Sequence, residues 1–450
     1  MSDLPKSFAY DPAKHSLSLD PRDPAFFKDP YPCYAALHAA SGPHGPAVYW
    51  QDYGHWVFGG LEAVNALFRD KRLGRQILHR TTREALGWPE PAAHTVDFDQ
   101  IDACSLLELE PPNHTRLRGL INRAFISRNV ETLGPAIAAE ATAAMDKFGK
   151  EAIDDLTGFA EPIVPSAAFA EPVDLLAAFA EPIDLLAAFA EPVAANTIAR
   201  MLGIDQAHVP NLLAWSHAMV AMYAFGRDRA VEEKANKAAR DFTAFVREQI
   251  AERRANPGTD LLSHLITAHE AEDRLSEQEI ISTTILLLNA GHEATVHALG
   301  NGLATLFGMT RERRARALAS PVAMTEEILR HTPPLHMFTR YVLEDCTLYG
   351  AELKQGDVIG LHLGLANRDP RAMPNPDDFD VERASVKQVA FGAGIHFCIG
   401  HTLARLEMAT VIPMLLQRFP QMTLAETPRF KDAYHFHGFE KLLVKMGDQR

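Results

Sequence analysis

The chain has 450 residues, and its 44 Lys and Arg against 58 Asp and Glu give a formal net charge of −14. Hydrophobic residues make up 47% and charged residues 23%, which is ordinary globular usage and excludes a disordered or collagen-like chain. The acidic balance argues against nucleic acid as a partner, because the phosphate backbone would be repelled.

The four cysteines are far apart and none belongs to a CxxC pair; they are Cys33, Cys104, Cys346 and Cys398. This spacing argues against a disulfide framework and against a zinc site built from thiolates. The N-terminus has no basic region followed by an apolar run. The apolar stretch near Ile280 to Ala290 is shorter than the roughly 20 residues that span a bilayer. We therefore expect a cytoplasmic protein without a membrane anchor.

The predicted elements are mostly helices, with small strands near both ends of the chain. β-branched and aromatic residues predict a hairpin at Ala47–Gly59, and helical patterning follows from about 61 to 345. A second β-rich patch, Arg340 to Gly364, precedes a Pro- and Asp-rich loop at 367–384, and a last helix is expected at His401–Arg418. The expected fold class is mainly α with a small β-sheet subdomain.

A tandem repeat with a ten-residue period occupies residues 159–193, where the motif FAEP begins at Phe159, Phe169, Phe179 and Phe189. The two middle units differ only at Val173 and Ile183, which indicates a recent duplication. We expect a surface insertion of about three units, since lengthening a loop costs little closure entropy. We also expect short helical pieces that start at each Pro. The alternative is a new partner or lid surface.

The strongest chemical signal is the sequence FGAGIHFCIG, from Phe391 to Gly400, directly before the last predicted helix. It places Cys398 in a Gly-rich turn at a helix N-terminus, where free amide groups and the helix dipole stabilise a thiolate. Gly394 and Gly400 allow the backbone to approach a large planar ligand and turn sharply. The alternative is an inert buried cysteine beside a flexible loop.

The spacing Phe391-x-x-Gly394-x-x-x-Cys398-x-Gly400 resembles the cysteine loop of the cytochrome P450 family at every fixed position. The resemblance runs from about residue 20 to the C-terminus, excepting the repeat. It implies a single P450 domain over residues 1–450 and heme b with the Cys398 thiolate as its axial ligand. The loop residues implied to lie against the heme include Gly392, with Phe391 and Gly400.

Two further groups of charged residues match motifs of the family. Glu327 and Arg330 form a Glu-x-x-Arg pair one helical turn apart, and Arg383 is implied to complete a buried network with them. The heme propionates need cationic or hydrogen-bonding partners. By resemblance these partners are His114, Arg118, Arg340 and His396.

On the distal side, LLLNAGHEATVHALGNG resembles the long helix over the heme, with Ala290, Gly291 and Glu293 at matching positions. The family's alcohol position holds Ala294, and the nearby hydroxyl of Thr295 is rotated by about 100° around the helix. Proton delivery could use Glu293 through water, a substrate hydroxyl, or Thr295 brought inward by a π-bulge. Poor delivery, with slow turnover, peroxide leakage or peroxide as the oxidant, is the fourth alternative.

The stretch from His292 to His297 superficially resembles a zinc-protease motif. That motif needs two histidines four residues apart on one helical face, whereas these are five apart and about 140° around the helix. We therefore expect no zinc site here. The histidines at 336, 435 and 437 are expected to be structural or pocket-lining.

The family resemblance implies a monooxygenase that uses O2 and a small apolar substrate. The expected pocket also draws on residues 85–108 and 212–226, and its named candidates are Leu287, Leu335, His336, Met337, Phe338 and Phe436. Methionine and aromatic walls favour a hydrophobic, aromatic or xenobiotic guest. The alternatives are a biosynthetic hydroxylase of a terpenoid, steroid or polyketide whose own hydroxyl replaces the missing alcohol, and a non-catalytic heme-thiolate sensor.

No flavin or iron–sulfur cysteine pattern is present, so electrons from NAD(P)H are expected to arrive through a separate ferredoxin and ferredoxin reductase. Four arginines could form a basic docking patch on the otherwise acidic protein. They are Arg116, Arg123, Arg128 and Arg405.

Overall fold

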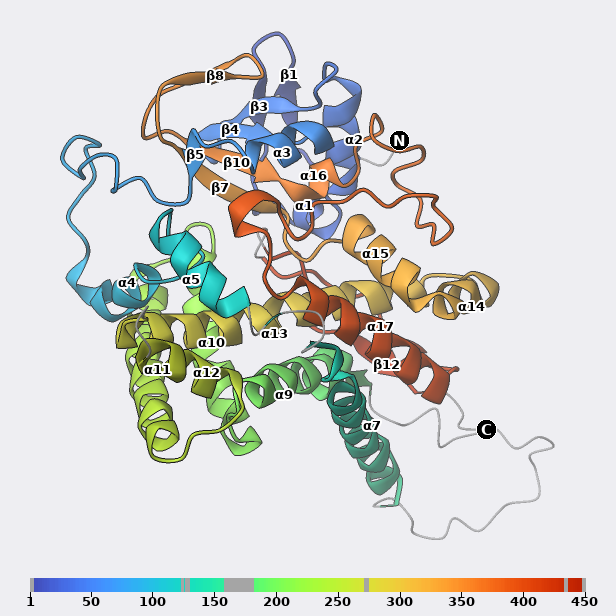
Figure 1. The fold of residues 1–450 in the computed structure, drawn as a ribbon. Coiled ribbons are helices and arrows are strands. Elements are labelled where there is room, and N and C mark those ends of the chain that lie inside the picture. The colour runs from blue at the N-terminus through green and yellow to red at the C-terminus, as the bar shows by residue number, and fades with distance from the viewer. Residues whose placement is uncertain are drawn as a thin grey trace.

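The computed structural model describes residues 4–122, 125, 130–157, 182–270, 275–432 and 436–446. Figure 1 shows the largest sheet at one end of the molecule and most of the helices at the other. Among the described residues, no helix is both long and apolar enough to cross a membrane.

Seven short strands form the largest sheet. In spatial order they are β1 (Ala9–Asp11), β2 (Ser16–Ser18), β3 (Ala47–Trp50), β4 (His55–Phe58), β10 (Val358–His362), β7 (Met337–Val342) and β5 (Leu73–Gly74). β3 and β4 form the predicted hairpin, with Trp50 opposite His55. β10 runs parallel to β4 and antiparallel to β7, and this register sets Arg340 opposite Ile359.

Two smaller sheets complete the β structure of the described residues. One orders β11 (Thr423–Leu424), β12 (Leu443–Lys445) and β6 (Ile183–Asp184), and the other pairs β8 (Cys346–Leu348) with β9 (Ala351–Leu353).

Helices form the remaining regular structure. Before the repeat they are α1 (Pro24–Lys28), α2 (Tyr31–Ala39), α3 (Leu61–Leu67), α4 (Val96–Asp102), α5 (Asn113–Asn122) and α7 (Gly134–Thr157). From the repeat onward they are α9 (Glu191–Met201), α10 (Val209–Val220), α11 (Arg229–Ala255), α12 (Leu261–Glu270), α13 (Glu277–Phe307), α14 (Arg311–Ala319), α15 (Pro321–His331), α16 (Leu363–Ala366) and α17 (His401–Arg418). The mainly α fold class is confirmed, and the single-domain organisation stays a prediction.

The long helix α13 crosses the middle of the molecule and contacts α9, α10, α15 and α17 (Figure 1). It begins with a capping box, in which the Ser276 hydroxyl accepts from the Glu279 amide while the Glu279 carboxylate accepts from the Ser276 amide. Most of its residues are buried, since neighbours cover nearly every face. A central helix of this kind can present side chains to a cavity and to a second helix at once.

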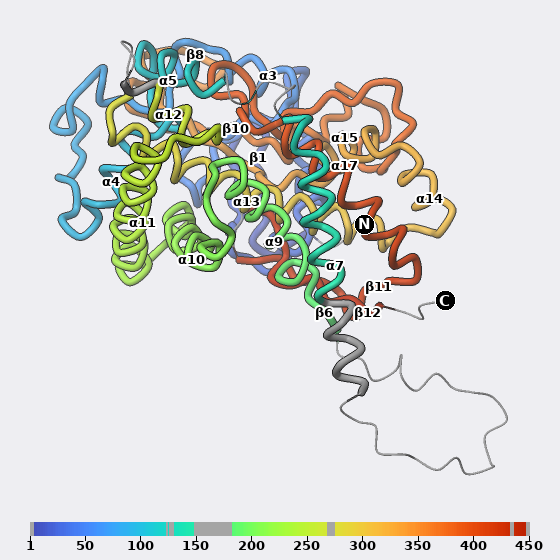
Figure 2. The backbone as a smooth tube through the Cα atoms, turned by 60° about the horizontal axis from the view of Figure 1, so that its bottom comes forward, coloured from blue at the N-terminus to red at the C-terminus, as the bar shows by residue number. Residues whose placement is uncertain are grey.

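The last unit of the tandem repeat is part of the core, so the predicted surface insertion is wrong for residues 182–193. Ile183 and Asp184 form β6 beside β12, and the following π-helical turn, Leu186–Ala190, leads directly into α9. Leu185 and Phe189 are fully buried. The repeat's earlier residues, 159–181, lie outside the described residues. Figure 2 shows α9 beside α7, against which it packs.

Candidate functional site

The cysteine loop is shaped by glycines that adopt backbone angles unfavourable for other residues. Gly392 and Gly394 have φ of 67° and 71°, and a side chain at Gly394 would collide with the carbonyl of Phe68. The Cys398 amide donates to the Phe391 carbonyl across 3.0 Å, which closes the loop. The loop therefore sets Cys398 on the wall of a cavity, just before α17.

Burial and nearby positive charges have opposite effects on the pKa of the Cys398 thiol. Burial raises the pKa of the thiol, whereas the backbone N–H of Gly400 and the guanidinium groups of Arg118 and Arg405 favour the thiolate. An amide hydrogen bond to the sulfur is the kind of outer contact that tunes a bound metal. This donor set fits a thiolate-ligated iron.

The four predicted propionate partners gather beside the cysteine loop. His114 is 2% exposed, and neither of its ring nitrogens has a hydrogen-bond partner within the described part of the chain. Its ring lies 4.5 Å from that of His396, centroid to centroid. Arg118 donates to the Phe397 carbonyl across 2.7 Å. Burial, with the nearby Arg75 charge, lowers the pKa of Arg340 to about 9.

The unpaired ring nitrogens of His114 and the buried guanidinium of Arg340 favour an anionic partner here, because burying such groups without one is costly. Glu110 supplies part of the compensation, since its carboxylate lies 3.7 Å from His396. Arg340 forms no salt bridge with any residue in the described ranges. The cluster thus fits the carboxylates of a heme, and Glu110 is a neighbour that the sequence did not reveal.

The predicted Glu-Arg-Arg network is assembled in the structure. Arg330 donates to both oxygens of Glu327 across 2.7 and 2.6 Å, and Arg383 donates to the same carboxylate across 3.0 Å. Both Glu327 and Arg330 are completely buried. Further hydrogen bonds join the two arginines to main-chain carbonyls of residues 367–378. The network therefore holds the loop that leads toward the cysteine.

On α13, the residues expected on the distal side all line the cavity; they are Ala290, Gly291, Glu293, Ala294 and Thr295. A side chain added at Gly291 would press on Ile198 at 3.0 Å, so this position is closely packed against α9. The Thr295 hydroxyl donates to the Gly291 carbonyl across 3.0 Å. The hydroxyl is thus bonded within its own helix, and position 294 supplies none.

Glu293 is the acid of this segment and is surrounded by basic groups. Burial by itself raises its pKa, but the hydrogen bond and charge of His297, with His292 and Lys431, hold the pKa at about 2. His297 Nε2 lies 3.1 Å from Glu293 Oε1. Glu293 is therefore a carboxylate throughout the physiological range.

The cavity is walled mainly by apolar side chains from α4, α5, α10, α13 and the cysteine loop. Four of the predicted pocket residues line it: Leu287, Leu335, Phe338 and Phe436. His336 and Met337 do not, because His336 bonds the Tyr34 hydroxyl at 2.7 Å and Met337 lies in a separate core cluster. Successive side chains of a strand point to opposite faces of the sheet, so at the start of β7 the side chains of Met337 and Phe338 lie on different faces.

The other predicted pocket regions also reach the cavity, through residues of 98–107 and 219–223. His437 is buried and stacks on Phe430 instead, and residue 435 lies outside the described residues. A polar corner that the sequence did not reveal is formed by Arg75, Asp102 and Tyr223. Burial and the Glu108 charge raise the pKa of Asp102 to about 7.

The family model for cytochrome P450 matches residues 71–309 and 322–440. The chain is a cytochrome P450. It is thus a monooxygenase. Membership of the family implies a heme with a thiolate ligand and the use of O2.

Relatives of this P450 cover nearly its whole length. The biotin biosynthesis cytochrome P450 of Bacillus subtilis (strain 168) is 30% identical, over 93% of this chain and 96% of that protein. The polyketide biosynthesis cytochrome P450 PksS of the same organism is 30% identical, over 88% and 89%. The crystal structure of P450BioI with a hexadec-9Z-enoic acid ligated acyl carrier protein has a TM-score of 0.79 at 29% identity, over 93% and 99%.

Two of the arginines expected to dock a redox partner form ion pairs within this P450. Arg116 pairs with Glu279, and Arg405 pairs with Glu326 while lying 4.5 Å over the Phe391 ring. Their side chains remain 35% and 31% exposed. Residues 123 and 128 lie outside the described residues. The positive surface near the cysteine loop is therefore partly neutralised.

Proposed function

We propose that this P450 hydroxylates a largely aliphatic biosynthetic molecule, such as a polyketide or steroid, that carries its own hydroxyl group near the carbon to be oxidised. When bound through Cys398, the heme supplies activation of O2 for insertion of one oxygen atom into a C–H bond. The residues of the chain supply substrate orientation and control of protons.

The observation that best supports this proposal is the alanine at position 294. The distal helix offers no hydroxyl at position 294, and the Thr295 hydroxyl is bonded to the Gly291 carbonyl. Glu293 is ionised and surrounded by histidines and Lys431. A hydroxyl on the substrate could be placed in the apolar part of the cavity, where it would order water beside Glu293.

The shape of the cavity lining supports the same substrate class. Its walls are mainly apolar, and the polar residues among them include Arg75, Asp102 and Tyr223 and, on α13, Ser282, Thr283 and Asn289. A site that is apolar except for a few placed polar groups fits a large hydrophobic molecule with few oxygen atoms. The relative named for polyketide biosynthesis also supports this choice over the aromatic or xenobiotic guest, which stays a prediction.

A pair of substrates that differ by one hydroxyl tests the proposal. Candidates are first found by the low-spin to high-spin absorption shift of the ferric protein with polyketide lactones and steroids. The hydroxylated compound should give more product per NADH consumed than its deoxy analogue, although both bind. In Ala294→Thr, the deoxy analogue should gain several-fold in this ratio, because the new hydroxyl replaces the missing one.

Equal ratios for the two substrates in the unaltered protein would contradict substrate-assisted proton delivery. An unchanged ratio in Ala294→Thr would show that position 294 does not limit proton supply. Saturable shifts with aromatic compounds alone would instead favour the aromatic guest.

We further propose that a separate ferredoxin and its NAD(P)H-dependent reductase deliver the electrons in the cytoplasm. The exposed parts of Arg116 and Arg405 support an acidic partner. The four cysteines are free, as is usual in a reducing compartment.

A further inference from the structure

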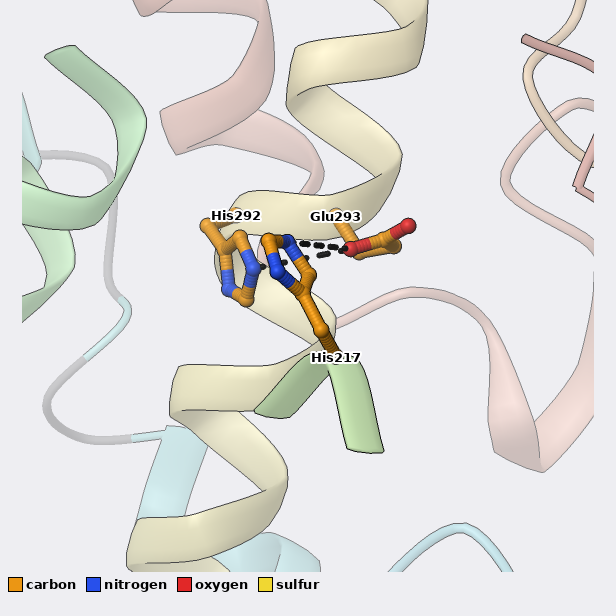
Figure 3. A group of neighbouring side chains, drawn as sticks. All are labelled: His217, His292 and Glu293. Atoms are coloured by element: carbon orange, nitrogen blue, oxygen red, sulfur yellow. Dashed lines mark ion pairs between the residues drawn. The ribbon is translucent and has the colours of Figure 1, made fainter. Parts of the chain in front are cut away.

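Two histidines from different helices converge on one carboxylate oxygen at the edge of the cavity. Figure 3 shows His217 of α10 facing His292 and Glu293 of α13. The Nε2 atoms of His217 and His292 each lie 3.5 Å from Glu293 Oε2. One ligand atom from each residue lies within 4.8 Å of the others.

The two oxygens of Glu293 have different neighbours. Oε1 faces His297 Nε2 at 3.1 Å and Lys431 Nζ at 3.9 Å. Among the described residues, the ion-pair partners of Oε2 are the two histidines of the cluster, at distances longer than a good hydrogen bond, which is about 2.7–3.2 Å. Zinc–ligand bonds of about 2.0–2.1 Å in a tetrahedron separate neighbouring ligand atoms by about 3.3–3.4 Å. The 3.5 Å spacings match two edges of such a tetrahedron.

His292 is oriented as a metal ligand. Its Nδ1 lies 2.8 Å from the Leu288 carbonyl, which can only accept a hydrogen bond, so Nδ1 carries the proton and Nε2 carries the lone pair. The side chain is 3% exposed, and Nε2 has no hydrogen-bond partner among the described residues. A backbone carbonyl that fixes the ring and tautomer is the usual outer contact of a metal-bound histidine.

The cluster is open on the α10 side. The His217 side chain is 43% exposed, which leaves a path from solvent. Glu191 Oε1 of α9 lies 4.0 Å from His217 Nε2 and could reach the fourth position, which water could otherwise fill. Lys431 is the competing cation, but it faces Oε1, the oxygen that the metal would not use.

We propose that His217, His292 and Glu293 form a Zn²⁺ site that ties α10 to α13. Two imidazoles and one carboxylate suit zinc and disfavour Mg²⁺ or Ca²⁺, which prefer all-oxygen ligands. Met219 and Val220 of α10 line the cavity, so a filled site fixes one of its walls. Coordination also removes Glu293 Oε2 from proton transfer, which makes zinc an inhibitor of turnover.

Zinc titration of the purified, heme-loaded protein by isothermal calorimetry, after treatment with a chelator, tests the site directly. We expect one Zn²⁺ per chain and an increase in the unfolding temperature that a chelator reverses. His217→Ala should weaken binding at least tenfold and abolish the temperature increase. This histidine is exposed, and an unchanged heme spectrum will show that the variant is folded.

His264→Ala is the matched control, because His264 is an exposed histidine on α12 and is not a member of the cluster. It should leave zinc binding unchanged. The proposal is overturned if the unaltered protein binds no stoichiometric zinc, or if His217→Ala binds it as tightly. Equal losses in both variants would indicate scattered surface binding and would also overturn it.

Discussion

Glu327 is the shared acceptor of a completely buried charge network, since both Arg330 and Arg383 donate to it. Glu327→Gln would leave two guanidinium groups without their carboxylate. Removing one partner of a buried ionic network costs about 3–5 kcal/mol. We expect a loss of this size in the free energy of unfolding, measured by urea denaturation, together with loss of bound heme.

The neighbouring Glu326 offers the control, because its pair with Arg405 is partly exposed. Glu326→Gln should cost at most about 1 kcal/mol, as is usual for exposed ion pairs. Similar losses in the two variants would contradict a special role for the buried network.

Glu407 on α17 gives a pH dependence of stability that can be measured. Burial raises its pKa to about 8 from the ordinary 4.5. Between these values the folded protein binds a proton that the unfolded chain releases, so this group lowers stability as the pH rises from about 4.5 to about 8. Glu407→Gln should therefore stabilise the protein relative to the unaltered chain at pH 8, and the difference should shrink at pH 5.

Thermal unfolding at the two pH values provides this measurement. The exposed Glu426 on the protein surface serves as the control, and Glu426→Gln should leave the unfolding temperature little changed. A constant difference between Glu407→Gln and the unaltered protein at pH 5 and pH 8 would show that Glu407 is ionised in the fold.

At the scale of elements, the structure of the last repeat unit depends on the helices and strands that pack against it. Its Phe189 is fully buried in the π-helical turn before α9. Phe189→Ala should lower the free energy of unfolding by about 3–5 kcal/mol, through lost burial and the remaining cavity. Phe225→Ala, at a side chain that is 43% exposed, should cost much less, and equal losses in denaturant titrations would contradict the core assignment.

The sequence could not reveal this packing, because the repeat units are nearly identical. β6 has two residues and pairs with β12, about 260 residues away in the chain, so no local periodicity marks it. By contrast, α17 has the bounds that were predicted, His401–Arg418, because the glycine at 400 ends the loop and helical patterning follows it. Pro413 lies inside this helix without ending it.

At the scale of the whole molecule, the negative net charge repels an acidic ferredoxin, whereas positive charge near the cysteine loop attracts it. The chain carries −14 overall, whereas Arg405 is partly exposed beside the cysteine loop. Arg405→Glu should raise the apparent KM for ferredoxin several-fold at low salt. The effect should fade at high salt, because the Debye length falls from about 10 Å at 0.1 M to about 3 Å at 1 M.

Arg418→Glu is the control, since Arg418 has a similar exposure at the other end of α17 and pairs with Asp146. Steady-state reduction rates against ferredoxin concentration will separate the two variants. An unchanged KM for Arg405→Glu at low salt would remove this residue from the docking surface.

The sequence by itself determined the features that depend on short stretches of chain: the glycine-rich turn around Cys398, the Glu-x-x-Arg pair and the missing hydroxyl at Ala294. Only the tertiary structure decided which distant groups meet. It placed His217 against His292 and Glu293, turned His336 and Met337 away from the cavity, and buried the last repeat unit. The physical reason is that backbone geometry and spacing act locally, whereas burial and charge pairing depend on helices and strands that are far apart in the chain.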